Sequence, residues 1–275
     1  MKKFLSVTLS LLLAASMPLS ALAETYDLAQ GSITVNAESG GQTVRQGGGA
    51  AIPDSAPVIT GTSKENNVTI NADSGQTASV TLSGVNIDVR DKGKAAVSTT
   101  GEGNVSIELN GESTLRSGYE HAGLEKNNGG SLTIADEDKN GKLTAWGGQQ
   151  GAGIGGGVYG KGEGITVSGN AQLKVRGGSV HGDYGTGAGI GGGGSYGTDG
   201  AEVEPDICAL NPGGKIEYYA PRSSMSGTPN KTVTNPTGDF VWDSGTVTTP
   251  ATCTGKALYY KSCAVCGLSS EGTAD

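Results

Sequence analysis

Long apolar runs, helical periodicity and positive charge are what this sequence lacks. After an apolar stretch near the N-terminus, no run of about 20 apolar residues follows, so the sequence predicts no transmembrane anchor. No later segment repeats its apolar residues every 3.6 positions, which excludes an α-helical bundle. The 27 acidic residues outnumber the 19 basic ones, and this balance argues against nucleic acid as a partner.

The first residues have the pattern of an export signal. Met1-Lys2-Lys3 is a short basic start, an apolar stretch runs from Phe4 to about Ala15, and Ser20-Ala21-Leu22-Ala23 has the small-x-small pattern of a cleavage site. We predict a signal peptide over residues 1–23 and a secreted, extracellular or cell-wall-associated mature chain. Its net charge of about −10 suits a soluble extracellular protein and would also attract divalent cations.

Glycine, by contrast, is abundant, and it separates many short strands. The chain has 49 glycines among 275 residues, a composition that first suggests disorder. However, alternating β-branched runs such as "NVTIN", "NVSIEL" and "SLTIA" lie between Gly, Asn and Asp turns. The sequence therefore predicts an all-β protein.

A repeat underlies these strands. A small-small-aliphatic triplet occurs four times, at spacings of 27, 30 and 36 residues. After each of the first three triplets come a loop, a short strand, a turn and a second strand, always in that order. The triplets are Ala95-Ala96-Val97, Ala122-Gly123-Leu124, Ala152-Gly153-Ile154 and Ala188-Gly189-Ile190.

This constant order predicts a parallel β-helix, in which each coil of three short strands stacks on the next. The narrow interior of such a solenoid suits Ala, Gly, Val and Ile and has little room for aromatic rings. A β-sandwich or meander is the alternative, because it also consists of short strands and turns. We predict a β-helix domain over residues 24–204.

Two of the triplets lie in nearly identical strings, "GAGIGGGVYG" and "GAGIGGGGSYG", and both satisfy G-x-G-x-x-G. A dinucleotide site needs a helix after the glycines, and "VYGKGEG" cannot begin one. A P-loop would need Ser or Thr where Gly162 stands. We predict no nucleotide binding, and we interpret the triplets as inward-facing steps of the coils, followed by glycines that form flexible loops.

The string "GAGIGGG" between strands of the form "LTI…KLTAWGG" resembles the glycine-rich repeats of secreted and surface proteins from Gram-positive gut bacteria. It is also similar to carbohydrate-binding, pectate-lyase-like β-helix proteins of clostridia. The resemblance covers about residues 67–200. It implies an extracellular right-handed parallel β-helix, in some members binding acidic polysaccharide through calcium, and it implies no catalytic set in this chain.

A calcium loop is the first candidate site. Asp136, Asp138, Asn140 and Gly141 follow the D-x-D-x-N-G spacing with which an EF-hand-type loop begins. Gly147 stands where that loop has its bidentate Glu, and no helices are expected on either side. The alternative is an acidic, solvated turn that joins two strands. Calcium is the cofactor that this loop suggests.

Polysaccharide cleavage is the second candidate activity. Hydrolases need converging carboxylates, whereas lyases need a basic residue beside acidic calcium ligands. The acidic residues of the repeat are scattered at no tight spacing, so we predict no catalytic residue. The basic and histidine candidates, which ordinary surface positions also explain, are Arg90, Arg116, Arg176, His121 and His181.

The few aromatic residues of the repeat are the candidate ligand contacts. Four of the five lie in glycine-rich loops, and exposed rings offer flat apolar faces to sugar C–H groups or protein partners. The alternative is that they cap the edges of coils. These residues are Tyr119, Trp146, Tyr159, Tyr184 and Tyr196.

After about Ala201 prolines become frequent and the repeat stops, which predicts a separate C-terminal module over residues 205–275. Its cysteines are expected to form disulfides in an exported chain, with half a zinc ribbon as the alternative. The string "TC…YY…C..CG" resembles modules near the ends of Gram-positive surface proteins and looks incomplete, as in a truncated gene or a longer native protein. The cysteines are Cys208, Cys253, Cys263 and Cys266.

Together these features predict a secreted or surface-exposed binding protein without catalysis. Its expected ligand is a polysaccharide or another extracellular or host component, bound in an adhesin-like manner. A polysaccharide lyase or hydrolase on the same scaffold, and a purely structural surface stalk, are the alternatives.

Overall fold

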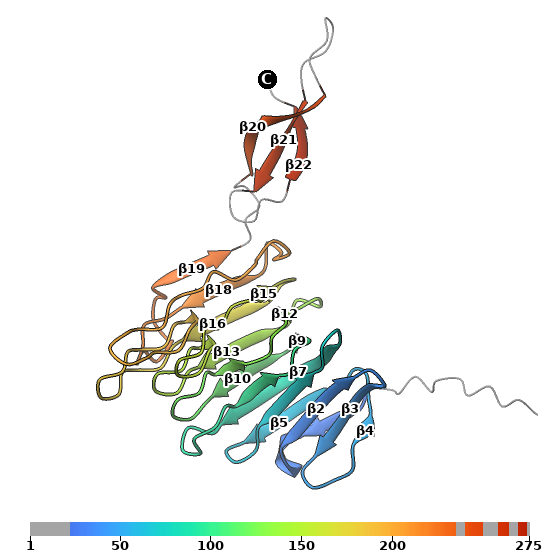
Figure 1. Cartoon of the computed structure of the whole chain (residues 1–275), viewed down its shortest axis with the longest axis vertical. Helices are drawn as coiled ribbons and strands as arrows, with labels where there is room; N and C mark the ends of the chain where they lie inside the picture. Colours follow the sequence, from blue (N-terminus) through green and yellow to red (C-terminus); the bar gives the residue numbers. More distant parts are fainter. Residues whose placement is uncertain (1–22, 235–239, 250–257, 264–268, 274–275) are drawn as a thin grey trace, which may run out of the picture.

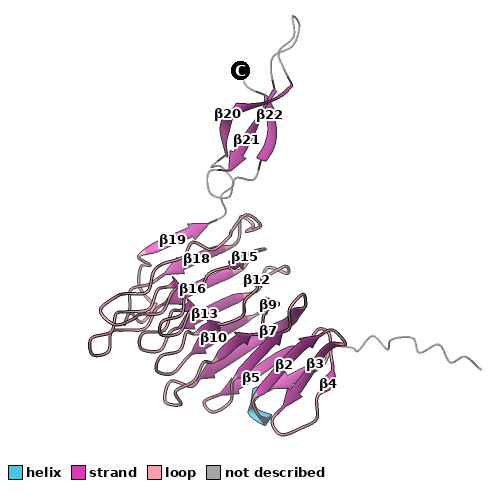
Figure 2. Ribbon diagram, viewed as in Figure 1, coloured by secondary structure: helices cyan, strands magenta, loops and turns pink. Residues whose placement is uncertain are grey.

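Strands make up nearly all of the regular structure (Figure 2). The computed structural model describes residues 23–234, 240–249, 258–263 and 269–273, so the predicted signal peptide up to Leu22 lies outside the described residues. Within this part of the chain, the 3-10 helix η1 (Leu28–Gln30) is the one helical element, and the side chain of Asp27 accepts a hydrogen bond from its second residue. No helix in the described ranges has the length and apolar character needed to cross a membrane.

The predicted repeat forms a parallel β-solenoid of about five turns (Figure 1). The aliphatic residues of the four triplets stack in register, Val97 on Leu124, Leu124 on Ile154 and Ile154 on Ile190. They begin successive strands of an eight-stranded sheet. Its strands, in spatial order, are β17 (Ile190–Gly191), β14 (Ile154–Gly155), β11 (Leu124–Lys126), β8 (Val97–Thr100), β6 (Val68–Ala72), β2 (Ile33–Glu38), β3 (Gly41–Gln46) and β4 (Ile52–Pro53).

The other two sides of the coils belong to one eleven-stranded sheet that bends around the solenoid. The first wall comprises β1 (Thr25–Asp27), β5 (Val58–Ser63), β7 (Thr77–Asp88), β9 (Asn104–Asn110), β12 (Leu132–Ala135) and β15 (Ile165–Val167). The second wall comprises β10 (Glu112–Arg116), β13 (Lys142–Trp146), β16 (Gln172–Arg176), β18 (Lys215–Tyr218) and β19 (Lys231–Thr234). The long strand β7 joins the walls, because its first part pairs with β9 and its last residues pair with β10.

The corner between the two walls is a sharp turn. Gly84 in β7 has φ +60°, and Gly111 between β9 and β10 has φ +71°. Residues with a Cβ rarely adopt this left-handed conformation, so glycine at these two positions lets a strand change direction within a single residue.

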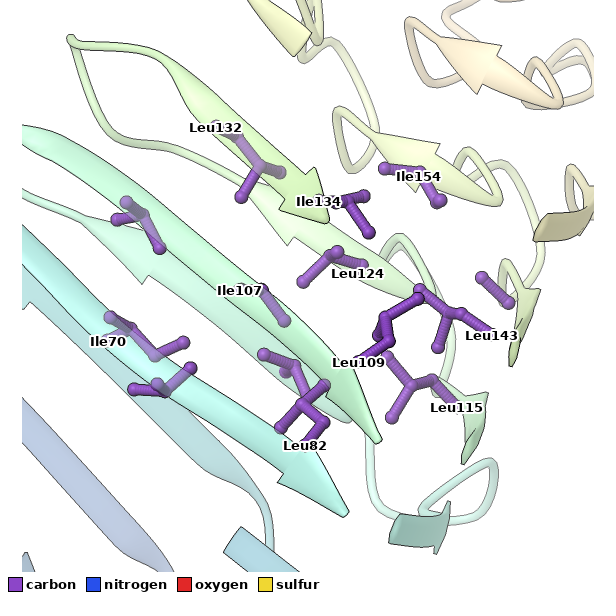
Figure 3. Packing of buried hydrophobic residues seen from close by; sticks show 14 of the residues in the cluster. Ile70, Leu82, Ile107, Leu109, Leu115, Leu124, Leu132, Ile134, Leu143 and Ile154 are labelled. Carbon is purple, nitrogen blue, oxygen red and sulfur yellow. The ribbon is translucent and has the colours of Figure 1, made fainter. Parts of the chain in front are cut away.

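Strand residues alternate between the interior and the outside, which is why the short runs alternate in sequence. In β13, Leu143 and Ala145 are buried while Thr144 and Trp146 are only half-buried. The inward side chains from all three sides meet in one narrow core of Leu, Ile, Val and Ala (Figure 3). Each large aliphatic side chain buried in this way stabilises the fold by about 1.5–3 kcal/mol.

The glycines of the repeated strings are part of the packed stack, and the prediction that they form flexible loops is wrong. Gly155, which directly follows the triplet Ala152-Gly153-Ile154, is buried, and a Cβ there would overlap the carbonyl oxygen of Gly191 in the next coil. Likewise, a Cβ at Gly151 would overlap the carbonyl oxygen of His121. These glycines are required because the backbones of successive coils approach each other closely.

Antiparallel strands close both ends of the solenoid. At the N-terminal end β2 and β3 form a hairpin and β4 pairs with β3, while at the other end β19 pairs antiparallel with β18. Because β18 pairs in parallel with β16, the stack continues well beyond residue 204, where the sequence placed the end of the repeat domain. The repeat signal fades there because the last coil departs from the triplet pattern.

The remaining described strands form a separate three-stranded antiparallel sheet. It consists of β20 (Phe240–Thr249), β21 (Leu258–Cys263) and β22 (Ser269–Thr273), in the order β20-β21-β22. This small sheet contains part of the predicted cysteine-containing module.

Candidate functional site

The outward residues at the ends of the second-wall strands form a stack across three coils. Arg116 of β10 pairs with Trp146 of β13, and Trp146 pairs with Arg176 of β16. The guanidinium carbon of Arg116 lies 3.8 Å from the centroid of the Trp146 ring, and that of Arg176 lies 4.5 Å from it. Since the two arginines come from the coils before and after Trp146, one guanidinium covers each face of the indole.

A cleft of about 430 Å³ opens beside this stack, where the chain leaves the second wall for the eight-stranded sheet. Tyr119, whose side chain is exposed, lies at the cleft together with hydrogen-bonding groups from several coils. A volume of this size is typical of small-ligand sites. The lining residues with functional side chains are Arg90, Asp91, Tyr119, Trp146, Gln149, Arg176, Ser179 and Arg222.

One carboxylate organises the N-terminal side of the cleft. Asp88 accepts two hydrogen bonds from Arg90, at 2.7 Å and 2.8 Å, and one of its oxygens lies 3.6 Å from Arg116. The hydrogen bonds from Arg90 hold the pKa of Asp88 below its usual value. Asp88 is therefore a fixed anion that positions two arginines, and its oxygens are already engaged.

The aromatic residues predicted to bind ligand fall into two groups. Trp146 and Tyr119 lie at the cleft, but both faces of Trp146 are covered by arginine, so the ring supports the guanidinium groups and is not a free platform for sugar. Tyr119 is the available ring in the cleft, and it makes an edge-to-face contact with the ring of His181, with centroids 5.2 Å apart.

The other three aromatic residues form a cluster on the glycine-rich loops. The Tyr184 ring lies between those of Tyr159 and Tyr196 in edge-to-face contacts, with centroids 6.0 Å and 5.8 Å apart. The hydroxyls of Tyr159 and Tyr184 are 3.2 Å apart. Tyr159 and Tyr196 are largely exposed, so this cluster is a second aromatic surface.

The predicted calcium residues do come together, but their oxygens are engaged in the turn. The carboxylate of Asp136 is buried and accepts hydrogen bonds from the backbone N–H groups of Lys139, Asn140 and Gly141. The Asn140 side chain donates to Asp138 and accepts from the backbone of Gly111. This network supports the solvated-turn alternative.

Glu108, which the sequence pattern did not connect with that turn, lies beside it. In the described part of the chain, Glu108, Asp136 and Asp138 are the one group of three His, Cys, Asp or Glu residues close enough to share a metal ion. Glu108 accepts a hydrogen bond from the backbone of Glu137, and burial together with the surrounding acidic groups raises its pKa. The turn precedes β13 whereas Trp146 ends it, so about 13 Å of strand separates the acidic group from the arginine cleft.

His121 forms a half-buried pair with Glu125. Its Nδ1 lies 2.7 Å from an oxygen of Glu125, and this hydrogen bond, with a second one to the backbone of Gly93, raises the pKa of His121. Burial alone would raise the pKa of Glu125, but hydrogen bonds from His121, Asn127 and the Ala122 backbone lower it below its usual value. The pair fixes the loop that carries Tyr119.

The His121–Glu125 pair predicts a pH dependence of stability. Because the folded-state pKa of His121 lies above 6.5, its contribution is fully present below pH 6.5 and is lost as the pH rises through that folded-state pKa. The contribution of Glu125 is present above pH 4.5 and is lost as the pH falls through its lowered pKa. We expect an NMR titration of the His121 ring to give a pKa above 6.5. We also expect the free energy of unfolding to fall as the pH rises from 6.5 through that pKa.

The matched variants are Glu125→Gln, which should lower the pKa of His121, and His121→Gln, which should flatten the change of stability above pH 6.5. A pKa of His121 at or below 6.5 in the native chain would contradict this assignment.

Two of the four cysteines lie within the described residues. Cys208 lies in the last coil, where its backbone N–H donates to Asp206. Cys263 is the last residue of β21, whereas Cys253 and Cys266 lie outside the described residues. Their disulfide or zinc pairing therefore stays a prediction.

The sequence suggested Arg90, Arg116 and Arg176 only as candidate bases, and it did not predict the stack that Arg116 and Arg176 form with Trp146. Their signal lay in the repeat itself, since "STLR", "LTAW" and "LKVR" place Arg116, Trp146 and Arg176 at the same strand position. Equivalent strand positions in successive coils thus carry the signal for this stack.

Comparison with protein-family models finds no matching family, and searches of curated proteins and of solved structures find no significant match. The fold and the geometry of the cleft are therefore what define this molecule: it is a parallel β-solenoid protein with an arginine-rich cleft on one side.

Proposed function

We propose that this chain is a secreted or cell-surface protein that binds carbohydrate, without catalysis, in the cleft beside the Arg116–Trp146–Arg176 stack. The observation that carries the proposal is the combination, in one open cleft of about 430 Å³, of an exposed Tyr119 ring with hydrogen-bonding side chains from successive coils. Sugars need such a combination, because their C–H faces pack on aromatic rings while their hydroxyls need hydrogen-bond partners.

The carboxylates support binding over hydrolysis. A glycosidase needs two carboxyl groups on either side of the scissile bond. At the cleft, Asp88 is engaged with Arg90 and Arg116, which leaves Asp91 as the lining carboxylate, and the acidic group around Asp136 lies at the opposite end of the strands.

A polysaccharide lyase is the second candidate, and Arg176 is the observation that favours it. Burial, together with the nearby Arg116 and Arg90, lowers the pKa of Arg176. A lowered pKa is what a basic residue needs in order to remove a proton from a substrate.

The deciding experiment combines binding with product analysis. The mature chain is screened on a glycan array, in calcium and in chelator, and each bound glycan is assayed for new reducing ends and unsaturated products. We expect binding without products, at least about tenfold weaker for Tyr119→Ala and unchanged for Tyr196→Ala, whose ring lies outside the cleft.

Products that disappear in Arg176→Gln would establish the lyase instead. Binding that depends on Tyr196 and not on Tyr119 would move the site to the tyrosine cluster, and binding to no glycan would refute the proposal.

A further inference from the structure

The cleft gathers most of the arginine in the molecule. The sequence contains five arginines, of which Arg90, Arg176 and Arg222 line the cleft and Arg116 stacks on the Trp146 ring there. The whole chain has a net charge of −8. Arginine, as distinct from lysine, is thus concentrated at one place on an acidic protein.

The acidic residues around the cleft do not balance these charges. Asp88 is shared between Arg90 and Arg116, and Asp91 is the one carboxylate among the lining residues. In the described ranges, no carboxylate lies within ion-pair distance of Arg176 or Arg222. Because Arg116 and Arg176 cover opposite faces of one indole ring, their like charges also repel each other across it.

Three side-chain donors of the Arg116–Trp146–Arg176 stack are buried without a partner. The Nε atoms of Arg116 and Arg176 and the Nε1 atom of Trp146 are buried, and none of them has a hydrogen-bond partner among the described residues. Half-buried Arg176 has a lowered pKa because burial and the neighbouring arginines disfavour its charged form. An anion beside these groups would relieve this unfavourable electrostatic energy, since charge-assisted hydrogen bonds are about twice as strong as neutral ones.

The geometry also suits an oxyanion. A guanidinium group presents several N–H donors in one plane, which matches the oxygens of a carboxylate or sulfate better than a lysine ammonium does. Stacking on Trp146 holds the planes of Arg116 and Arg176 in place, so less side-chain freedom is lost when a ligand binds.

We propose that the cleft is an oxyanion site in which Arg176 and Arg222 bind a carboxylate or sulfate group of the ligand directly, without a bridging metal ion, while Arg116 supports the stack from the other face of Trp146. The inference rests on the proposed carbohydrate-binding function and narrows the ligand to an anionic glycan. The shared chemistry is an oxyanion carried on a sugar ring, from either a uronate or a sulfate ester.

The test measures affinity by calorimetry, in chelator and at low salt, with two matched pairs of probes. One pair is a uronate trisaccharide and its neutral methyl ester, and the other is a sulfated oligosaccharide and its desulfated form. We expect at least one anionic probe to bind about tenfold or more tightly than its neutral counterpart, with an affinity that falls as salt is added. The pair that shows the difference identifies the oxyanion.

The variants separate the oxyanion contact from general effects on the fold. Arg176→Gln should lose about tenfold or more of the affinity for the anionic probe and little for the neutral one, and Arg176→Lys should lie between Gln and Arg. Arg45→Ala is the matched control, because this fifth arginine lies in β3, outside the cleft, and should bind like the native chain. Thermal unfolding confirms that each variant folds.

Each other outcome overturns the inference in a distinct way. Equal binding of charged and neutral probes, lost in Tyr119→Ala, would leave the carbohydrate function standing and refute the oxyanion site. Binding abolished by chelator would show that a metal ion is required. Arg176-dependent binding of a poly-glutamate peptide but of no glycan would refute both the proposed function and the inference.

Discussion

Replacing Gly151 by Ala is expected to lower the free energy of unfolding by about 3 kcal/mol or more. Gly151 is buried, and an added methyl group would overlap the carbonyl oxygen of His121 in the preceding coil. The obstacle is backbone that cannot rotate away, so the two coils must separate. That separation would strain the hydrogen bonds between them, such as the one from the Gly148 N–H to the His121 carbonyl. Overpacking of this kind typically costs about 1–3 kcal/mol, and more where nothing can yield.

Urea denaturation at 25 °C, compared with the native chain, measures this effect. Gly48→Ala is the matched control, because Gly48 is exposed and a Cβ there would meet no atom within 4 Å. We expect its free energy of unfolding to change by no more than about 0.5 kcal/mol. Equal effects at the two positions would contradict a steric requirement for glycine at position 151.

Replacing Asp136 by Ala is expected to cost about 3–5 kcal/mol, because one carboxylate satisfies three backbone N–H groups of the turn. The substitution would remove three charge-assisted hydrogen bonds and leave the N–H of buried Gly141 without its acceptor. Asp136→Asn should cost less, because its amide retains one acceptor oxygen. The measurement is again the free energy of unfolding, taken with calcium and with chelator.

Asp138→Ala is the control for Asp136. Asp138 is exposed and accepts a hydrogen bond only from the Asn140 side chain among its described contacts, so we expect a change within about 0.5 kcal/mol. If Asp136→Ala destabilises equally with and without calcium, the carboxylate is a structural part of the turn. A calcium-dependent stabilisation that both variants lose would instead establish the predicted metal site.

The fold could be predicted because its signals are local and repeated. Alternation in runs such as "KLTAW" indicated which residues point inward, and the recurring triplets fixed the stacking of Val97, Leu124, Ile154 and Ile190. The alternation of side chains within a strand and the recurrence of the coils are both visible in the order of residues along the chain. The last coil lacks the triplet, and the predicted boundary of the repeat domain was therefore placed too early. The stack extends past it to β18 and β19.

The site could be predicted only in part. Tyr119 is exposed, as its place in a loop indicated. The sequence also located the acidic turn. It did not show that Asp136 accepts hydrogen bonds from three backbone N–H groups of that turn, because this depends on the direction of those groups. Trp146 was expected to offer a free face, whereas the neighbouring coils place a guanidinium on each side of it. Such contacts depend on residues about 30 positions away along the chain.

The sequence by itself determined that the protein is all-β, and it favoured a solenoid over a sandwich or meander, because the same order of triplet, loop and strands recurs along the chain. Only the tertiary structure decided what the outer surface does. Stacking converts residues at equivalent coil positions into neighbours a few ångströms apart, and this brings four scattered arginines to one cleft and packs glycine backbone against glycine backbone. Inward positions are constrained by burial and are therefore visible in the sequence pattern, whereas outward positions acquire their chemistry only from the coil above and the coil below.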